Sequence, residues 1–290
     1  MREFFFSKLN GQGNDFILID STKENIDLSK EEIRYLCDRN FGIGADGLIL
    51  AKDSSIADYK MDYYNQDGSS AEMCGNGIRC LARFILEKNI DHKEDLDIET
   101  LAGIKKIKVS MDSGNVGMIT VNMGKPFFMP SDIPVKLDDM SKDRVFGHEI
   151  ALDDIKFEVN LVSMGNPHCI IFTDEDLSKI PLEIWGPKLE NHELFPNKTN
   201  VEFVRKNSED SIEMRVWERG VGETLACGTG ACASAVASIA AGKVSSNTIN
   251  VKLRGGDLLI KWDKASDDIF LTGEVDHVYE GRFISKKKGI

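Results

Sequence analysis

Two cysteines, Cys74 and Cys227, each lie among glycines immediately before a run of helix-forming residues. Glycines allow a backbone to approach a ligand closely, and the free N–H groups at a helix start favour negative charge. A thiol in that position is favoured as a thiolate, the reactive form of cysteine. The sequence therefore predicts that these two thiols carry the chemistry of the chain.

The two cysteine loops are parts of a long internal duplication. The residue numbers of Cys74 and Cys227 differ by 153. The same offset aligns Asn65 with Glu218, Gly75 with Gly228, and Gly77 with Gly230. An offset of 152 aligns Gly13-Asn14 with Gly165-Asn166. A repeat of this length is far too long for a solenoid, so we expect two similar halves.

Duplicated thiols suggest acid–base chemistry on a stereocentre. If the halves face each other across a pseudo-two-fold axis, one thiolate can remove a proton from a carbon while the opposite thiol protonates its other face. An amino-acid α-proton is very weakly acidic, so aimed donors must stabilise the developing charge. The candidate donors are the backbone N–H groups of Gly75, Asn76, Gly228 and Thr229.

Nothing in the sequence indicates pyridoxal phosphate, so we expect no cofactor. We expect no metal site, because the cysteines lack the usual paired spacing.

The helices and strands expected around the cysteine loops indicate an α+β fold. Each pseudo-symmetric half should be a curved mixed or antiparallel sheet wrapped around a central helix, at 78–88 and at 231–241. Ser29 and Glu32 have the spacing of a capping box, and 177–192 is helix-like. Prolines at 126, 130 and 134 mark the crossing between halves. We expect an N-terminal half at 1–126, completed by 275–290, and a C-terminal half at 127–274.

The composition is that of an acidic globular chain. It has 290 residues, a net charge of −12 and 29% charged residues. The main basic run is Lys286-Lys287-Lys288. Such a chain is not expected to bind nucleic acid or an anionic membrane. No apolar stretch reaches transmembrane length. We expect a cytoplasmic protein with reduced cysteines.

Several motifs in order along the chain resemble those of the diaminopimelate epimerase family. They are Gly11-Gln12-Gly13-Asn14-Asp15-Phe16, Met73-Cys74-Gly75-Asn76-Gly77-Ile78-Arg79-Cys80, Ser163-Met164-Gly165-Asn166-Pro167-His168, Glu218-Arg219-Gly220 and Ala226-Cys227-Gly228-Thr229-Gly230. The resemblance extends from about Lys8 to about Gly273, nearly the whole chain.

This resemblance implies the family's fold and a cofactor-independent epimerase acting on diaminopimelate in lysine biosynthesis, typically as a homodimer. It implies that Cys74 and Cys227 are acid and base, and that His168 and Glu218 adjust the thiols. The implied substrate-binding residues are Asn14, Asn65, Gly75, Asn76, Asn166, Asn200, Glu218, Arg219, Gly228 and Thr229. One position departs from some members of the family, which carry glutamine where this chain has Gly47.

Other functions remain open at this point. A proline-type racemase also uses two cysteines, and a phenazine-type isomerase shares the fold without them. A thiol redox protein or a non-catalytic binding module would belong to other classes. The remaining cysteines, at 37, 80, 169 and 232, are expected to be buried core residues, the usual place of a free cysteine.

Overall fold

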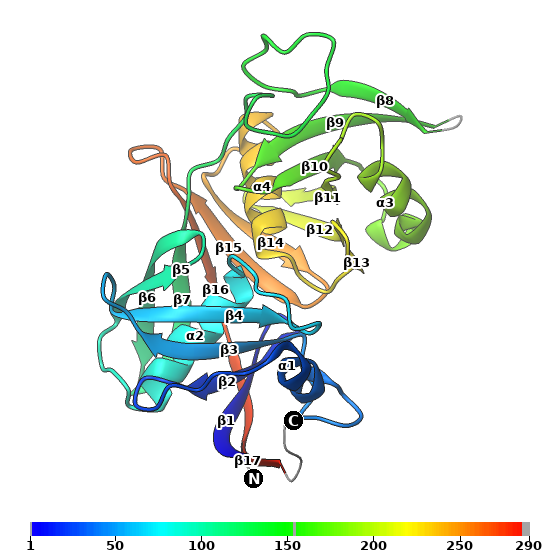
Figure 1. Ribbon diagram of the computed structural model, residues 1–290. Coiled ribbons are helices and arrows are strands. Elements are labelled where there is room, and N and C mark those ends of the chain that lie inside the picture. Colours follow the sequence, from blue (N-terminus) through cyan, green and yellow to red (C-terminus); the bar gives the residue numbers. More distant parts are fainter. Residues whose placement is uncertain (1, 153–154, 286–290) are drawn as a thin grey trace. The chain divides into compact units, whose positions relative to one another are not determined.

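The structure is a computed structural model that describes residues 2–152 and 155–285. The chain divides into two compact units (Figure 1). Unit 1 comprises residues 1–122 and 272–290, and unit 2 comprises residues 123–271. Of the expected closing segment 275–290, residues 286–290, and with them the basic run, lie outside the described residues.

Unit 1 is built from antiparallel hairpins joined by parallel pairings. Its elements are β1 (Arg2–Gly11), β2 (Asn14–Asp20), α1 (Lys30–Cys37), β3 (Gly47–Asp53), β4 (Tyr59–Asn65), α2 (Gly75–Glu87), β5 (Asp95–Thr100), β6 (Gly103–Asp112), β7 (Asn115–Gly124) and β17 (Asp276–Ser285). Neighbouring strands pair in the order β17-β1-β2-β3-β4-β5-β6-β7. The β2–β3 and β4–β5 pairs are parallel, and the others are antiparallel.

Unit 2 repeats this pattern. Its elements are β8 (His148–Leu152), β9 (Ile155–Ser163), β10 (Pro167–Phe172), the 3-10 helix η1 (Leu177–Lys179), α3 (Leu182–Glu190), β11 (Asn200–Ser208), β12 (Ser211–Glu218), β13 (Gly222–Glu223), α4 (Gly228–Ala240), β14 (Thr248–Leu253), β15 (Gly256–Trp262) and β16 (Ile269–Gly273). The strands pair in the order β8-β9-β10-β11-β12-β14-β15, with parallel β10–β11 and β12–β14 pairs.

The strand registers show that the duplication found in the sequence is also present in the structure. In unit 1 Phe16 lies opposite Gly47, and in unit 2 His168 lies opposite Asn200. Leu48 pairs with Tyr64 as Val201 pairs with Trp217. These pairs are related by the offsets found in the sequence. In each unit the long helix that starts beside the cysteine follows the same antiparallel hairpin.

The long helix of each unit is buried against its own sheet, as the α+β expectation required. Helix α2 packs against β1, β2, β3, β4 and β6, and α4 packs against β9, β10, β11, β12, β14 and β15. In α4 nearly every residue from Gly228 to Ser238 is buried, so small side chains allow strands to approach on several sides. A helix that is apolar on all faces is typical of such a buried position.

The connecting segments differ in places from their sequence patterns. The capping box of α1 is present: Ser29 Oγ accepts from the Glu32 N–H, and Glu32 Oε2 accepts from the Ser29 N–H. The expected helix-like stretch 177–192 is divided into η1 and α3. Pro181 explains the division, because proline has no N–H and disfavours a helical conformation in the residue before it.

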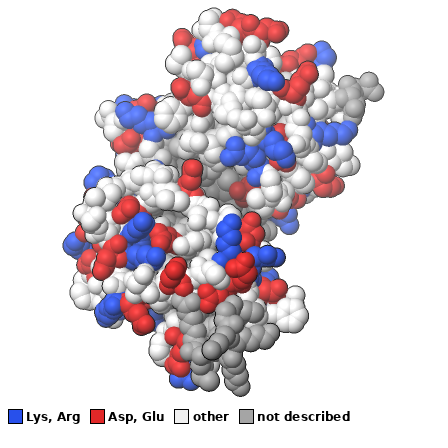
Figure 2. Space-filling model, viewed as in Figure 1, with Lys and Arg blue, Asp and Glu red and all other residues white. Residues whose placement is uncertain are grey.

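The surface mixes charges of both signs. On the face shown in Figure 2, the basic and acidic side chains are interspersed over both units. Along the described chain, no helix is long and apolar enough to span a membrane.

Candidate active site

Cys74 is the N-cap residue of α2 in unit 1. Its backbone is extended (φ −138°, ψ 121°), and its Sγ accepts a hydrogen bond from the Gly77 N–H at 3.4 Å. Residues 75 and 76, the first two of the helix, are buried. The first N–H groups of a helix have no intrahelical acceptor, so Gly75 and Asn76 can offer theirs to an anion beside the thiol.

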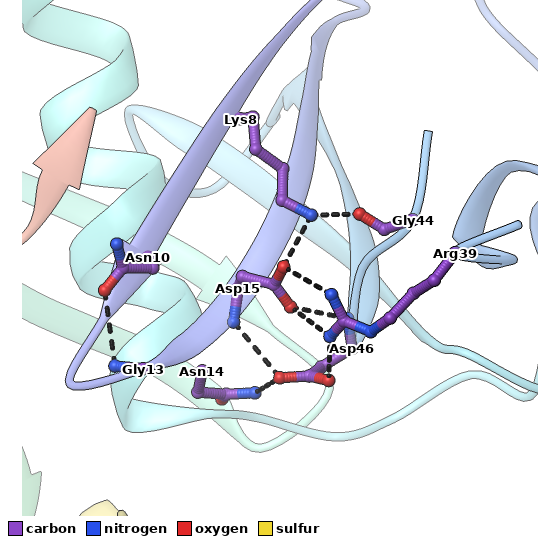
Figure 3. Close-up of polar contacts among 8 residues, drawn as sticks. All are labelled: Lys8, Asn10, Gly13, Asn14, Asp15, Arg39, Gly44 and Asp46. Carbon is purple, nitrogen blue, oxygen red and sulfur yellow. Dashed lines mark hydrogen bonds and ion pairs between the residues drawn. The ribbon is translucent and has the colours of Figure 1, made fainter. Parts of the chain in front are cut away.

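Asn14 lies next to Cys74 and is held by a cluster of charged side chains (Figure 3). Cys74 Sγ is 3.6 Å from Asn14 Oδ1, and Asn14 Nδ2 donates to Asp46 Oδ2 at 2.9 Å. Arg39 donates to both oxygens of Asp15 and to Asp46 Oδ1. Lys8 Nζ lies 2.6 Å from Asp15 Oδ2. The cluster fixes the turn between β1 and β2, and thereby the position of Asn14.

Arg79, a residue of α2, connects the cysteine loop to the β1–β2 turn. It is completely buried, and it donates to the Gly75 carbonyl at 2.9 Å, to Asn76 Oδ1 at 3.0 Å and to Gln12 Oε1. One guanidinium therefore joins the first turn of α2 to the β1–β2 turn. The bidentate geometry of arginine suits it to such a junction.

Asn65 and Gly47 lie opposite each other at adjoining ends of β4 and β3. Asn65 Nδ2 donates to Ser69 Oγ at 3.0 Å. A side chain at Gly47 would start 2.7 Å from the Tyr64 carbonyl and 2.8 Å from the Tyr63 ring. With this packing, a glutamine there would require its neighbours to move, so the departure from the family pattern at Gly47 agrees with the tyrosines beside it.

Cys227 occupies the equivalent position in unit 2, as the N-cap of α4. Its Sγ accepts from the Gly230 N–H at 3.3 Å and lies 3.5 Å from Thr229 Oγ1. It is only 6% exposed. Burial raises the pKa of the Cys227 thiol well above its usual value, and the carboxylates of Glu218 and Glu202 raise it further. These surroundings favour the protonated form of Cys227, in contrast to the thiolate expected from its place at a helix start.

A buried chain of hydrogen bonds leads away from Cys227. Asn166 Nδ2 donates to Thr229 Oγ1 at 3.3 Å, and Asn166 Oδ1 lies 3.1 Å from His168 Nε2. His168 Nδ1 lies 2.6 Å from Glu202 Oε1, and both of these side chains are completely buried. Burial raises the pKa of Glu202, while His168 opposes the shift. The pair places a second titratable unit close to the thiol.

Glu218, Arg219 and Asn200 lie together in unit 2. Asn200 donates to the Pro167 carbonyl at 2.8 Å and accepts from the Arg219 N–H at 2.9 Å. Thr224 Oγ1 donates to Glu218 Oε1 at 2.5 Å. Burial raises the pKa of Glu218, against hydrogen bonds from Thr224 and Cys227. Asn200 therefore fixes the backbone from which the Glu218 and Arg219 side chains project.

The expected site residues are thus divided between the two units. Cys74 has Asn14, Asn65, Gly75 and Asn76 on the same unit, and Cys227 has the other members of the set. The sequence alone assigned no role in the site to Asp46, Arg79 or Glu202. A signal existed for Glu202, since a carboxylate between Val201 and Phe203 in an apolar strand is costly unless it has a partner. The four remaining cysteines are buried, as expected.

Comparison with known proteins identifies the family. The sequence profile described as diaminopimelate epimerase matches residues 6–129 and 160–278. The diaminopimelate epimerase of Halothermothrix orenii is 49% identical over 285 residues, covering 97% of this chain and 98% of that one. That of Methanococcus maripaludis strain C5 is 46% identical over 276 residues, covering 95% and 98%. The chain belongs to the diaminopimelate epimerase family.

Solved structures show that the fold extends beyond the diaminopimelate epimerase family. A hydroxyproline epimerase from Agrobacterium vitis superposes with a TM-score of 0.70 at 13% identity, over 97% of this chain and 92% of that one. A PhzF-family phenazine biosynthesis protein from Bacillus anthracis has a TM-score of 0.67 at 16% identity, with coverages of 98% and 100%. At such identities the likeness concerns the fold alone. The two-unit α+β architecture expected from the sequence is therefore confirmed.

Proposed function

We propose that this chain is a cofactor-independent epimerase that interconverts LL- and meso-diaminopimelate in lysine biosynthesis. The two relatives that are 46% and 49% identical over nearly the whole chain are named diaminopimelate epimerase. The observation that carries the proposal is the repeated placement of a cysteine, Cys74 or Cys227, at the N-cap of the buried helix in each unit.

In the proposed mechanism the two cysteines act as a base and an acid on opposite faces of the α-carbon. One thiolate takes the α-proton, and the other thiol gives its proton to the opposite face. The roles are reversed after each turnover, so no oxidant or reductant is consumed. The free N–H groups at the starts of α2 and α4 would stabilise the developing carboxylate charge, and loss of one such donor typically costs about 2.7–4 kcal/mol.

The substrate has charged groups at both ends, and the proposed binding residues match them. Arg219 can pair bidentately with a carboxylate, and Glu218 can accept from an ammonium group. The amides of Asn14, Asn65, Asn166 and Asn200 supply the remaining polar contacts, directly or by holding neighbouring backbone. A site of this kind rejects analogues that lack the matching group. His168 and Glu218 are proposed to adjust the thiols.

The two-cysteine scheme is tested by Cys74→Ala and Cys227→Ala. Each variant should lose at least about 100-fold in epimerisation, because one acid–base group contributes 10²–10⁴-fold. The assay follows the conversion of LL- to meso-diaminopimelate without added cofactor, because a single remaining thiol could still exchange the α-hydrogen with solvent. Cys80→Ala and Cys232→Ala, which remove buried thiols from the same helices, serve as matched controls and should stay active. Appreciable turnover in either N-cap variant contradicts the scheme.

The alternative functions predict different results in the same assays. A proline-type racemase would turn over proline or hydroxyproline in preference to diaminopimelate. A thiol redox protein would exchange no α-hydrogen with solvent, and a binding module would be insensitive to Cys227→Ala. Each result would replace the proposed substrate or reaction.

We also propose that the protein works as a homodimer in the cytoplasm. The paired strands β1 and β17 expose apolar side chains, with Phe5 at 72%, Val278 at 55% and Ile284 at 39% exposure. A second copy would remove these apolar side chains from water. Light scattering should give twice the mass of one chain for the wild type and a lower mass for Phe5→Glu. A monomeric wild type contradicts the proposal.

A further inference from the structure

The orientation of the Asn14 amide is determined by its neighbours. A carboxylate accepts hydrogen bonds and donates none, so the 2.9 Å contact with Asp46 Oδ2 must be made by the Asn14 NH₂ group. The amide oxygen then faces the other way. It lies 3.6 Å from Cys74 Sγ and 3.5 Å from Asn76 Nδ2.

A second, longer contact agrees with this orientation. The Arg79 guanidinium donates hydrogen bonds and accepts none, so its 3.0 Å contact must be made to the oxygen of Asn76. The Asn76 NH₂ group therefore faces Asn14, where it requires an acceptor. Obligate partners at both ends, Asp46 and Arg79, thus agree that Asn14 presents its oxygen to Cys74.

Asp46 is itself held in place by other groups. Its Oδ1 accepts from Arg39 at 2.7 Å, and its Oδ2 also accepts from the Asp15 N–H at 3.2 Å. In return, the Asp46 N–H donates to Asp15 Oδ1 at 3.0 Å. Figure 3 shows the Asp46 carboxylate between Asn14 and Arg39. Both of its oxygens are engaged, so the carboxylate has little freedom to turn away from Asn14.

In unit 2 the equivalents of Asp46 and Asn14 make different contacts. The residue that corresponds to Asp46 by the repeat offset is Thr199, whose hydroxyl donates to the Asn200 carbonyl. The counterpart of Asn14 is Asn166, whose oxygen faces His168 and whose NH₂ group faces Thr229 beside Cys227. An amide oxygen therefore faces the cysteine of unit 1, whereas an amide NH₂ group faces the cysteine loop of unit 2.

We propose that Asp46 is a positioning residue for Cys74, because it holds the Asn14 amide so that its oxygen receives the thiol proton. The inference rests on the proposed function of Cys74 as an acid–base group. The Asn14 oxygen keeps the S–H directed toward it and disfavours the thiolate. If the amide turned over, its NH₂ group would face the sulfur and favour the thiolate. Arg39 contributes by fixing Asp46.

The test is the Asp46→Asn variant, read out by alkylation of individual cysteines. An asparagine has nearly the same size but can either donate or accept, so only the long 3.5 Å contact with Asn76 Nδ2 still favours the original orientation of Asn14. Iodoacetamide reacts with the thiolate, and peptide mass spectrometry assigns the rate to each cysteine at one fixed pH. Cys74 should react about two- to tenfold faster, as expected for the loss of one ordinary hydrogen bond. The buried Cys80 should react at an unchanged rate, whereas general loosening of unit 1 would accelerate both cysteines.

A double-mutant cycle shows whether Asp46 acts through Asn14. Asn14→Ala should itself accelerate alkylation of Cys74, and adding Asp46→Asn should give no further increase. Asp97→Asn is the matched control, because Asp97 is similarly exposed in unit 1 and pairs with Lys106 on the surface. Its Cys74 rate should equal that of the wild type. If Asp46→Asn folds poorly, Arg39→Gln should show a smaller increase in the same direction.

An unchanged Cys74 rate in Asp46→Asn, or additive effects in the double variant, would overturn the inference. These readouts do not depend on turnover of diaminopimelate. A wild-type protein without epimerase activity would therefore contradict the proposed function, while the alkylation rates would still decide the role of Asp46.

Discussion

Cys74 and Cys227 have the same place in two equivalent helices but different surroundings. The thiol of Cys74 meets the oxygen of Asn14, and the helix that it caps contains the buried cation Arg79. Cys227 is buried beside two carboxyl groups, those of Glu218 and Glu202, which raise its pKa together with burial. Acid–base chemistry with two identical side chains requires that they differ in protonation during the reaction, and the proton affinity of each thiol is set here by different groups.

Replacing Glu218 with glutamine should lower the pKa of Cys227. The carboxylate disfavours a second negative charge close by, and glutamine removes that charge while keeping the size. In Glu218→Gln, the pH midpoint of Cys227 alkylation should shift to lower pH, measured by peptide mass spectrometry in a Cys74→Ala background. Glu209→Gln, a change of an exposed glutamate in the same unit, should leave the midpoint in place. A midpoint that is unchanged or higher in Glu218→Gln would contradict this assignment.

At the residue scale, the sequence could predict the cysteine positions but not their supporting charges. Repetition and glycine flanks marked Cys74 and Cys227, because these are local features of the chain. Asp46 and Arg79 support the Cys74 loop. Asp46 does so through Asn14 and Arg79 through Gln12, which lie 32 and 67 positions away from them along the chain. No local pattern distinguishes such a residue from an ordinary surface charge.

At the element scale, the β1–β2 turn is held by ion pairs to other segments. Lys8 of β1 and Arg39, just beyond α1, both bind Asp15 of β2. Burial alone would raise the pKa of Asp15, but the hydrogen bonds from Arg39 and Lys8 outweigh it and hold that pKa well below its usual value. These contacts therefore stabilise the folded state while Asp15 is ionised.

Asp15→Asn should destabilise unit 1 at neutral pH by about 2 kcal/mol, less than for a fully buried pair because Arg39 is half exposed. The folded-state pKa of Asp15 is lowered, so its contribution is complete above about pH 4, the unfolded pKa of aspartate, and is lost as the pH falls further. Urea unfolding of wild type and variant should give a difference that is largest at neutral pH and shrinks below pH 4. A difference that grows on acidification would contradict the ion-pair account.

The elements themselves were partly predictable. The capping box of α1 and both cysteine-led helices follow from local residue types, and they are present. The helices begin at Gly75 and Gly228, three residues earlier than the apolar patterns indicated, because each cysteine is the N-cap and the glycines form the first turn. The two-residue strand β13 is too short to show an alternating pattern.

At the scale of the whole molecule, unit 1 consists of two distant parts of the chain. Strand β17 pairs with β1 along its length, from Arg2 opposite Ser285 to Asn10 opposite Asp276. Phe4 stacks on Phe283 with ring centroids 5.2 Å apart, and Phe6 packs over Gly281, where a Cβ would be 2.6 Å from its ring. Unit 2, in contrast, is one continuous segment with its own core around Val159, Leu161 and Phe203.

A chain that ends at Gly273, and so lacks β17, should lose the fold of unit 1 and keep that of unit 2. Removing β17 exposes the edge of β1 and the apolar side chains that β17 covers. The buried cysteines report on each unit: Cys37 and Cys80 should become reactive toward iodoacetamide, while Cys169 and Cys232 should stay protected. Protection of all four would show that β17 is dispensable, and reactivity of all four would show that unit 2 needs unit 1.

The pairing of the first strand with the last also determines the order in which the protein can mature during translation. Strand β1 is synthesised before unit 2, but its partner β17 is synthesised after unit 2. Domains generally fold as units when their sequence has emerged. Unit 2 can therefore fold on the nascent chain, while unit 1 has to wait until β17 has been made.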